Sequence, residues 1–168
     1  MNRRYTAEEY LALCRRLRNV FDMPAVTTDL MVGFPGETED EFHQTLQFLE
    51  RAHFAKVHVF PYSRRPGTRA DGFENQVPEE EKARRAARAA QAAEQSRMAF
   101  LKAMAGRIEP VLFERCSVPH VGRGHTANGT GVQVSCDQPL RGKLLPVRLT
   151  GVTFDGQYCQ GSLLEELP

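Results

Sequence analysis

The stretch from Glu79 to Ala105 constrains the fold more than any other part of this chain, because it contains neither glycine nor proline. Alanine, the residue with the highest helix propensity, recurs along it, Pro78 suits a first helical position, and Gly106 follows its end. It predicts one helix of roughly 28 residues, about 40 Å long. We expect a connecting or bracing helix rather than part of a core, with different structures on its two sides.

Two further helices are predicted before it from their start signals. Thr6 and Glu9 have the spacing of a capping box, and apolar residues at helical spacing extend the pattern over Ala7–Val20. Thr38 and Glu41 form a second such box, at the start of another segment with one apolar face. Both segments are therefore expected to be amphipathic surface helices.

Two strands are predicted between these helices. Residues 25–34 are rich in valine, threonine, leucine and methionine, and residues 56–62 form a similar run that is broken by Pro61. The first run is apolar on both parities, as expected for a parallel strand that is covered on both faces. The alternating order of helices and strands predicts a parallel α/β unit with a right-handed crossover.

Beyond Gly106 the helical pattern stops and short β-prone runs take over. They occupy residues 110–116, 131–135, 144–150 and 157–161, and glycine, proline, asparagine and aspartate separate them. Their spacing predicts a small antiparallel β-barrel of about 60 residues. The expected domains are thus an α/β part over residues 1–76, a connecting helix over 77–105 and a β-barrel over 106–168.

Composition excludes some classes of protein and leaves others open. The net charge is +1 over 168 residues, so bulk electrostatics give no strong attraction to nucleic acid or anionic membranes. No apolar run approaches the ~20 residues that span a bilayer, so we expect a cytoplasmic protein with no membrane partner. The cysteines are too far apart for CxxC or CxxxCxxC, which predicts buried thiols and no metal ligands: Cys14, Cys116, Cys136 and Cys159.

Two turn motifs follow the predicted strands. Residues 33–38 read GFPGET, and residues 58–68 read HVFPYSRRPGT. The carboxyl ends of parallel strands are where α/β proteins place their chemistry. Glycines without Cβ allow a cofactor to approach the backbone, and the helix that follows presents free N–H groups.

These features, in this order, resemble the C-terminal half of a radical-SAM tRNA methylthiotransferase. The matching elements are residues 28–38, residues 62–68, the QVPEE run at 76–80 before a long helix, and a closing β-barrel of the TRAM type. The resemblance covers nearly the whole chain. It implies part of a radical-SAM partial TIM barrel followed by an RNA-binding module.

The resemblance also implies an activity and its cofactors. Such enzymes insert a methylthio group at an unactivated carbon of tRNA, using S-adenosylmethionine and two 4Fe-4S clusters. The CxxxCxxC run that holds the first cluster is not in this sequence, and residues 1–5 correspond to the interior of a full-length enzyme. We therefore expect a fragment or truncated reading frame that is inactive alone, with no catalytic or metal-ligating residue, and with tRNA and the missing N-terminal part as partners.

The substrate and the class of function stay open at this point. Residues 58–63 most closely resemble the branch that acts on threonylcarbamoyladenosine beside the anticodon, while the isopentenyladenosine and ribosomal-protein branches are the alternatives. A rival from another class is a stand-alone RNA-binding or interaction module without catalysis. A third is an unrelated α/β domain with a coincidental GFPGE.

The resemblance assigns a cofactor-binding set at the strand ends. If the face of Asp29 is the barrel lumen, its carboxylate is buried and needs a ribose hydroxyl or an arginine, with a structural ion pair as the alternative. Glu37 could instead only decorate the helix start, and Phe60 could be a core aromatic. The full set is Asp29, Gly33, Phe34, Pro35, Gly36, Glu37, Phe60 and Tyr62.

A second set is expected to contact RNA, because arginine suits phosphate and basic loops grip RNA backbones. Part of it follows the second strand, and the rest lies in what reads as a glycine-rich loop of the barrel. Solvated surface charge is the competing interpretation, and Gly129 stands where the family usually has an aromatic residue. The set is Arg64, Arg65, Arg69, Arg123, His125 and Asn128.

Overall fold

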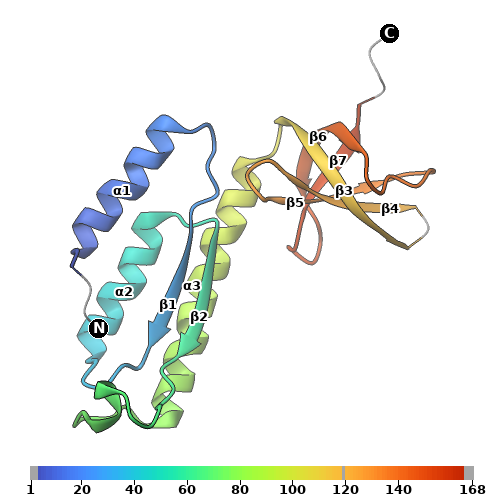
Figure 1. Ribbon diagram of the computed structural model, residues 1–168. Coiled ribbons are helices and arrows are strands. Elements are labelled where there is room, and N and C mark those ends of the chain that lie inside the picture. The colour runs from blue at the N-terminus through green and yellow to red at the C-terminus, as the bar shows by residue number, and fades with distance from the viewer. Residues whose placement is uncertain (1–3, 119, 165–168) are drawn as a thin grey trace. The chain divides into compact units, whose positions relative to one another are not determined.

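The computed structural model describes residues 4–118 and 120–164. Two compact units divide the chain: one comprises the residues up to Val20 together with Val26–Arg97, and the other comprises Phe21–Ala25 with the residues from Met98 onward. Helices and strands alternate in the first unit, and a closed barrel of five strands makes up the second (Figure 1). The expected mixed α/β class with a small β-barrel is confirmed.

The three predicted helices are present. They are α1 (Ala7–Val20), α2 (Glu39–Ala52) and α3 (Glu79–Ala103). Both capping boxes form: the Thr6 and Thr38 hydroxyls each accept a backbone N–H three residues on, and the glutamates at those positions accept hydrogen bonds in return. These reciprocal bonds satisfy N–H groups that a helix start otherwise leaves unpaired, so local sequence alone determines where α1 and α2 begin.

The strands β1 (Thr27–Val32) and β2 (Lys56–Pro61) pair in parallel, in register from Thr27 with Lys56 to Val32 with Pro61. The ladder continues one step further, because the Tyr62 amide donates to the Val32 carbonyl at 2.8 Å. After β2 the chain passes through a short 3-10 helix, η1 (Arg69–Gly72), before α3 begins.

The helices cover one face of this two-stranded sheet. Leu30 packs with α1, α2 and α3 residues, and Val32 is completely buried between Phe42 of α2 and Ala89 of α3. The opposite face presents exposed side chains, namely Thr27, Asp29, Lys56, His58 and Phe60. The expectation that the first strand is covered on both faces is therefore wrong for the described residues, since all of the packed helices lie on one side.

Helix α3 is more than the connector that its composition predicted. It buries Lys82, Arg85 and Ala89 to within 5% exposure in the first unit, and Leu101 contributes to the core of the second. The buried positions recur every three to four residues, which is the spacing of one helix face. Reading α3 as a bracing helix outside the core was wrong.

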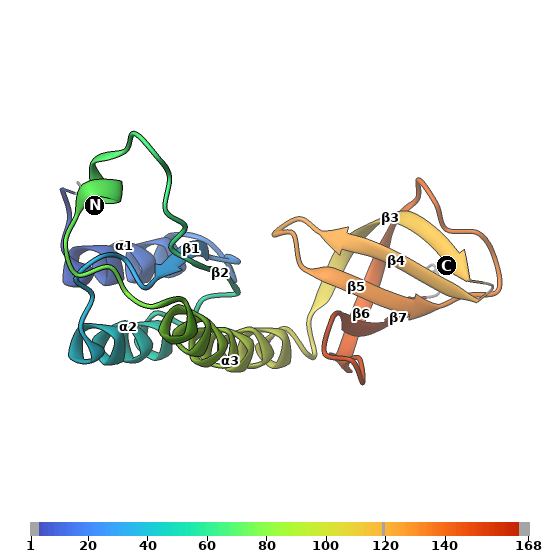
Figure 2. The same cartoon turned by 90° about the horizontal axis from the view of Figure 1, so that it is seen from below.

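Five strands form the barrel (Figure 2): β3 (Ile108–Val118), β4 (Val121–Thr126), β5 (Gly131–Ser135), β6 (Leu144–Val152) and β7 (Cys159–Leu163). Their order is β3-β4-β5-β7-β6, and β6 pairs with β3 to close the ring. The barrel was expected to be antiparallel, but β5 and β7 pair in parallel, because β7 inserts between β5 and β6. Its core includes Val111, Phe113, Val132, Val134, Val147, Leu149 and Cys159.

Strand β4 corrects the prediction of a glycine-rich loop at this position. Its glycines face the interior: a Cβ on Gly122 would lie 2.9 Å from Leu140 Cδ1, and one on Gly124 would collide with the Leu112 carbonyl oxygen. Arg123 and His125 alternate with these glycines and point outward. Glycine marks close approach of neighbouring strands here, rather than a turn.

Candidate functional site

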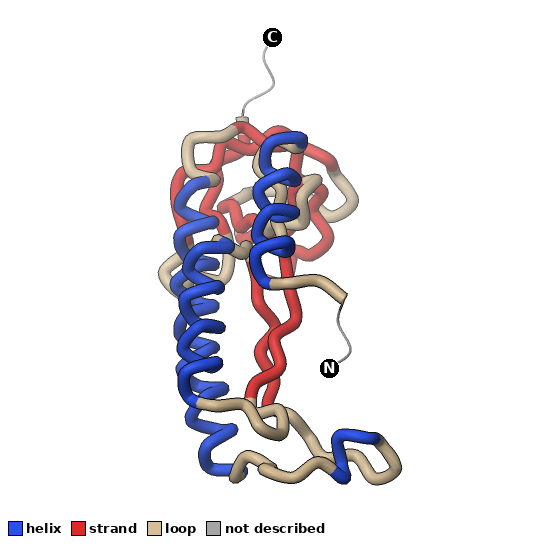
Figure 3. The backbone as a smooth tube through the Cα atoms, turned by 90° about the vertical axis from the view of Figure 1, so that its left-hand side faces the viewer, coloured by secondary structure: helices blue, strands red, loops and turns tan. Residues whose placement is uncertain are grey.

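The turns that follow β1 and β2 meet at the C-terminal end of the sheet (Figure 3). The Phe34 ring packs edge-on against the Tyr62 ring with centroids 5.3 Å apart, and also lies 6.1 Å from the Phe73 ring. The Gly36 amide donates to the Asn75 carbonyl at 2.9 Å. The two turn motifs therefore form one site, as their places after parallel strands predicted.

Gly33 and Gly36 both have left-handed backbones, with φ of 73° and 85°. A Cβ on Gly36 would have no atom within 4 Å, whereas a Cβ on Gly33 would lie 2.5 Å from Cγ of Lys82. Gly33 thus has a packing reason as well as a backbone reason to lack a side chain. The sequence suggested space for a cofactor or the geometry of an ordinary turn, and it did not predict the contact with Lys82.

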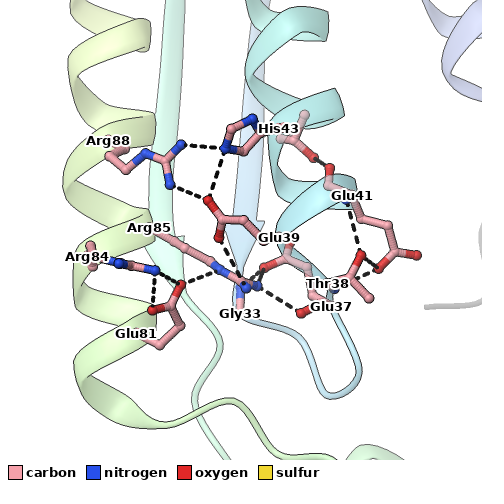
Figure 4. Close-up of polar contacts among 11 residues, drawn as sticks. Gly33, Glu37, Thr38, Glu39, Glu41, His43, Glu81, Arg84, Arg85 and Arg88 are labelled. Atoms are coloured by element: carbon pink, nitrogen blue, oxygen red, sulfur yellow. Dashed lines mark hydrogen bonds and ion pairs between the residues drawn. The ribbon is translucent and has the colours of Figure 1, made fainter.

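The carboxylate of Glu37 bridges this turn to α3 (Figure 4). Its Oε2 accepts the Gly33 amide at 2.7 Å and Nη1 of Arg85 at 2.7 Å, while the Glu37 carbonyl accepts the same Nη1 at 2.9 Å. The Glu37 side chain is only 15% exposed. Glu37 therefore does more than place a negative charge at the helix start. It links two parts of the turn through the Gly33 amide, and it links the turn to α3 through Arg85.

Arg85 is the centre of a network of charges on α2 and α3 (Figure 4). Its Nε donates to Glu81 at 2.9 Å, and its Nη2 lies 3.5 Å from Glu39. Burial disfavours its charged form, but hydrogen bonds to Glu37 and Glu81 outweigh this and raise the pKa of Arg85. In the same network, hydrogen bonds from Arg88 and Arg84 respectively lower the pKa values of Glu39 and Glu81.

Tyr62 supplies a buried polar atom without a partner. Its side chain is 7% exposed, and its hydroxyl makes no hydrogen bond among the described residues. The Lys82 ammonium lies 5.3 Å from the centre of the Tyr62 ring and pairs with Glu79 at 2.7 Å. A buried hydroxyl left unpaired costs stability, so a ligand atom at this position would restore its hydrogen bond.

The remaining predicted cofactor residues lie in the turn after β1 or on the two strands. Phe34 and Pro35 are half-buried, and Phe60 is 40% exposed rather than in the core. Asp29 lies opposite His58 on the uncovered face and is exposed, so the buried carboxylate expected for a lumen-facing strand is not seen. No second layer packs on that face in the described part of the chain, which is why the carboxylate stays accessible.

The arginines after β2 lie on an exposed loop. Arg64 is engaged by Asp71, with Nε to Oδ1 at 2.8 Å and Nη2 to the Asp71 carbonyl at 2.8 Å. Arg65 and Arg69 are exposed, and Arg69 begins η1. Their accessibility is compatible with phosphate contact, which stays a prediction.

On the barrel, the predicted RNA-binding residues divide into two kinds. Arg123 donates to Gln133 at 3.0 Å and lies 4.9 Å over the Tyr158 ring, and His125 lies 3.2 Å from Glu114. Asn128 instead ties a turn together, since its Oδ1 accepts from Thr126 and Thr130 and its Nδ2 donates to the Met23 carbonyl. The structure therefore gives Asn128 a structural role in the turn between β4 and β5. Tyr158, which no sequence motif singled out, adds an aromatic ring beside Arg123.

No group of metal-ligating side chains is found in residues 4–118 and 120–164, apart from side chains too uncertain to describe. Cys14 and Cys159 are buried, and burial raises the pKa of Cys159 to about 11. The side chain of Cys116 lies outside the described residues. Among the helices that the structure describes, none combines the length and apolar character needed to cross a membrane.

Comparison with known proteins finds one family match and a set of similar proteins. Residues 1–49 match the Radical SAM superfamily. Over most of its length the chain is similar to proteins named tRNA-2-methylthio-N(6)-dimethylallyladenosine synthase. It is 38% identical over 154 residues to the one from Acetivibrio thermocellus. This alignment covers 90% of this chain and 32% of the Acetivibrio protein. The values are 36% over 167 residues for Finegoldia magna and 38% over 168 residues for Syntrophobacter fumaroxidans.

The latter two alignments cover 98% and 99% of this chain and 36% of each relative. The chain thus spans about a third of the length of the curated relatives it matches, and both compact units lie within the similarity. A crystal structure of a multidomain protein with nucleic acid binding domains from Streptococcus pneumoniae aligns with this chain in part. The alignment covers 39% of this chain and 24% of the Streptococcus chain. Its TM-score of 0.33 and 16% identity are too low to bear on fold or function.

Proposed function

We propose that this chain forms part of a radical-SAM tRNA methylthiotransferase that acts on N(6)-dimethylallyladenosine, which is also called isopentenyladenosine. The observation that carries the proposal is the 36–38% identity to synthases of that name over 98–99% of the chain. The similarity runs through the α/β unit and the barrel alike, so it is not limited to the GFPGET turn.

The first unit would supply part of the S-adenosylmethionine site. The fit is supported by the unpaired Tyr62 hydroxyl, by the open space beside Gly36 and by the aromatic rings of Phe34 and Tyr62. Tyr62 would donate a hydrogen bond, while the rings and the accessible Phe60 would pack on apolar parts of the cofactor. When bound, S-adenosylmethionine supplies the methyl group and the radical chemistry.

In this proposal the turn residues and Asp29 have separate roles. Gly33 and Gly36 shape the turn, and Glu37 holds it rather than contacting the cofactor directly. Asp29, on the accessible face, is available for a ribose hydroxyl. The 4Fe-4S clusters would be held by residues outside this sequence.

The barrel would act as the TRAM-like module that holds tRNA. Arg123, the ring of Tyr158 and His125 support this role, because a cation beside an aromatic ring suits a phosphate next to a stacked base. Arg65 and Arg69 would add contacts from the first unit.

The identity of the modified nucleoside can be tested directly in cells. Deleting the gene should remove the 2-methylthio group from N(6)-dimethylallyladenosine in tRNA, as measured by nucleoside mass spectrometry, and re-expression of the complete reading frame should restore it. Unchanged nucleosides would overturn the proposal.

The threonylcarbamoyladenosine branch is the second candidate, favoured by residues 58–63. The same mass spectrum separates the two, because only one of the two methylthio nucleosides would disappear. Purified chain that binds tRNA, with no change in either nucleoside, would instead favour a stand-alone RNA-binding module.

A further inference from the structure

We propose that Arg85 of α3 is a positioning residue for the turn at residues 33–38: through the carboxylate of Glu37 it holds the amide of Gly33, and so maintains the shape of the turn. The link to a ligand rests on the function proposed above, whereas the control of the turn does not. Nothing in the sequence pattern singled out Arg85, which lies 48 residues from Glu37.

The contacts form a continuous chain. Nη1 of Arg85 contacts Glu37 Oε2 at 2.7 Å, and the same oxygen accepts the Gly33 amide at 2.7 Å. Arg85 also binds the Glu37 carbonyl at 2.9 Å, so one guanidinium nitrogen fixes both the side chain and the backbone of Glu37. The turn is also packed against α3, because the Lys82 side chain lies against Gly33.

Burial makes this contact strong. Arg85 is 5% exposed, so removing its charge would leave the carboxylate of Glu37 in a poorly solvated place without its cation. Hydrogen bonds between charged groups are the strong kind, and separate nitrogens of the guanidinium hold Glu37 and Glu81 at once. A lysine at this position would keep the charge but would not reproduce these separate contacts.

Arg84 provides a matched control. It is the neighbouring arginine on the same helix and shares Glu81 as a partner, at 2.7 Å, but its side chain is 62% exposed. Its pairing is to Glu81 and not to Glu37. Replacing it removes the same charge without touching the chain of contacts to Gly33.

The test is hydrogen exchange of the Gly33 amide, resolved by NMR on the complete chain, with the amide of Leu30 in β1 as an internal reference. Arg85→Gln and Glu37→Gln should each accelerate Gly33 exchange about tenfold relative to Leu30, since each removes a hydrogen bond between charged groups. Arg85→Gln in the Glu37→Gln background should add little, and Arg85→Lys should restore part of the protection. Arg84→Gln should leave the ratio unchanged.

Equal acceleration of Gly33 exchange in Arg84→Gln and Arg85→Gln would overturn the positioning role. Full additivity of the Arg85→Gln and Glu37→Gln effects in the double variant would overturn it as well. If Arg85→Gln does not fold, Gly33 exchange is compared in Glu37→Gln and Arg85→Lys instead. Exchange in both that is no faster than in Arg84→Gln would then overturn the positioning role. Calorimetry with S-adenosylmethionine on the same variants separates the two proposals. Loss of Gly33 protection with no cofactor binding in any variant, wild type included, would contradict the proposed cofactor site and leave the positioning role intact.

Discussion

Gly33 lies against the buried side chain of Lys82, so closely that an added Cβ would sit 2.5 Å from Lys82 Cγ. Gly36 shares the left-handed backbone but has open space where its Cβ would be. The two glycines of one turn are therefore required for different reasons, and their alanine variants should behave differently.

Gly36→Ala should lower the free energy of unfolding by about 1–2 kcal/mol, the cost of a left-handed non-glycine residue. Gly33→Ala adds a collision and should lower it by roughly 2–4 kcal/mol. Urea unfolding followed by circular dichroism measures both. Because the collision involves Lys82, the change Lys82→Ala should cost less in the Gly33→Ala background than in the wild type; an equal cost would disprove the contact.

Asn128→Ala should destabilise the barrel by about 1–3 kcal/mol, because buried hydroxyl and amide groups of Thr126 and Thr130 lose their acceptor. Asn128→Asp is the matched variant, since it keeps the acceptor oxygen but replaces the donor to the Met23 carbonyl and the Met104 sulfur with a second, negatively charged acceptor. Thermal unfolding of the barrel should rank the wild type, the aspartate variant and the alanine variant in falling order. A stable alanine variant with weakened RNA binding would instead restore the role that the sequence suggested for Asn128.

Binding of tRNA should weaken with salt, and each arginine that contacts phosphate should contribute ~0.7–0.9 to the slope of log affinity against log salt concentration. Arg65→Ala and Arg123→Ala are each expected to reduce the slope by that amount. Arg64→Ala should reduce it less, because Asp71 already binds this guanidinium. Fluorescence anisotropy with labelled tRNA measures the slopes. Arg51→Ala, which removes an exposed arginine paired with Glu8, is the control; a similar loss there would indicate a nonspecific charge effect.

Acid should destabilise the first unit. Hydrogen bonds from the Thr38 amide and hydroxyl lower the pKa of Glu41 from its ordinary 4.5, and those from Arg88 and Arg84 do the same for Glu39 and Glu81. A lowered folded-state pKa means that this stabilisation is complete above pH 4.5 and is lost as the pH falls through the folded value. Unfolding measured from pH 7 to pH 3 should show the decline. Glu41→Gln should make it shallower, and Glu80→Gln, an exposed charge on α3, should have a smaller effect.

The parts of the fold that local chemistry determines were predictable. Capping boxes marked the starts of α1 and α2, and the alanine-rich stretch marked α3. Strand β4 was missed because Gly122 and Gly124 resemble loop residues until their neighbours across the barrel are known. Local patterns do not contain those long-range contacts.

The candidate site was predictable in place but not in detail. Parallel strand order brings the two turn motifs together, which the contact between the Phe34 and Tyr62 rings bears out. The contribution of α3 was not foreseen, since this alanine-rich stretch was expected to be a connecting helix outside any core. Lys82, Arg85 and Ala89 recur every three to four residues and so lie on one helix face, but this spacing does not predict their burial, because charged residues are seldom buried.

The closed hydrogen bonding of the barrel gives its strands neighbours on both sides, whereas β1 and β2 pair only with each other among residues 4–118 and 120–164. Each therefore exposes one edge of backbone donors and acceptors to any extended peptide nearby. Aggregation of the purified chain should begin at β1 and β2, and the barrel expressed without them should stay monodisperse at concentrations where the complete chain precipitates.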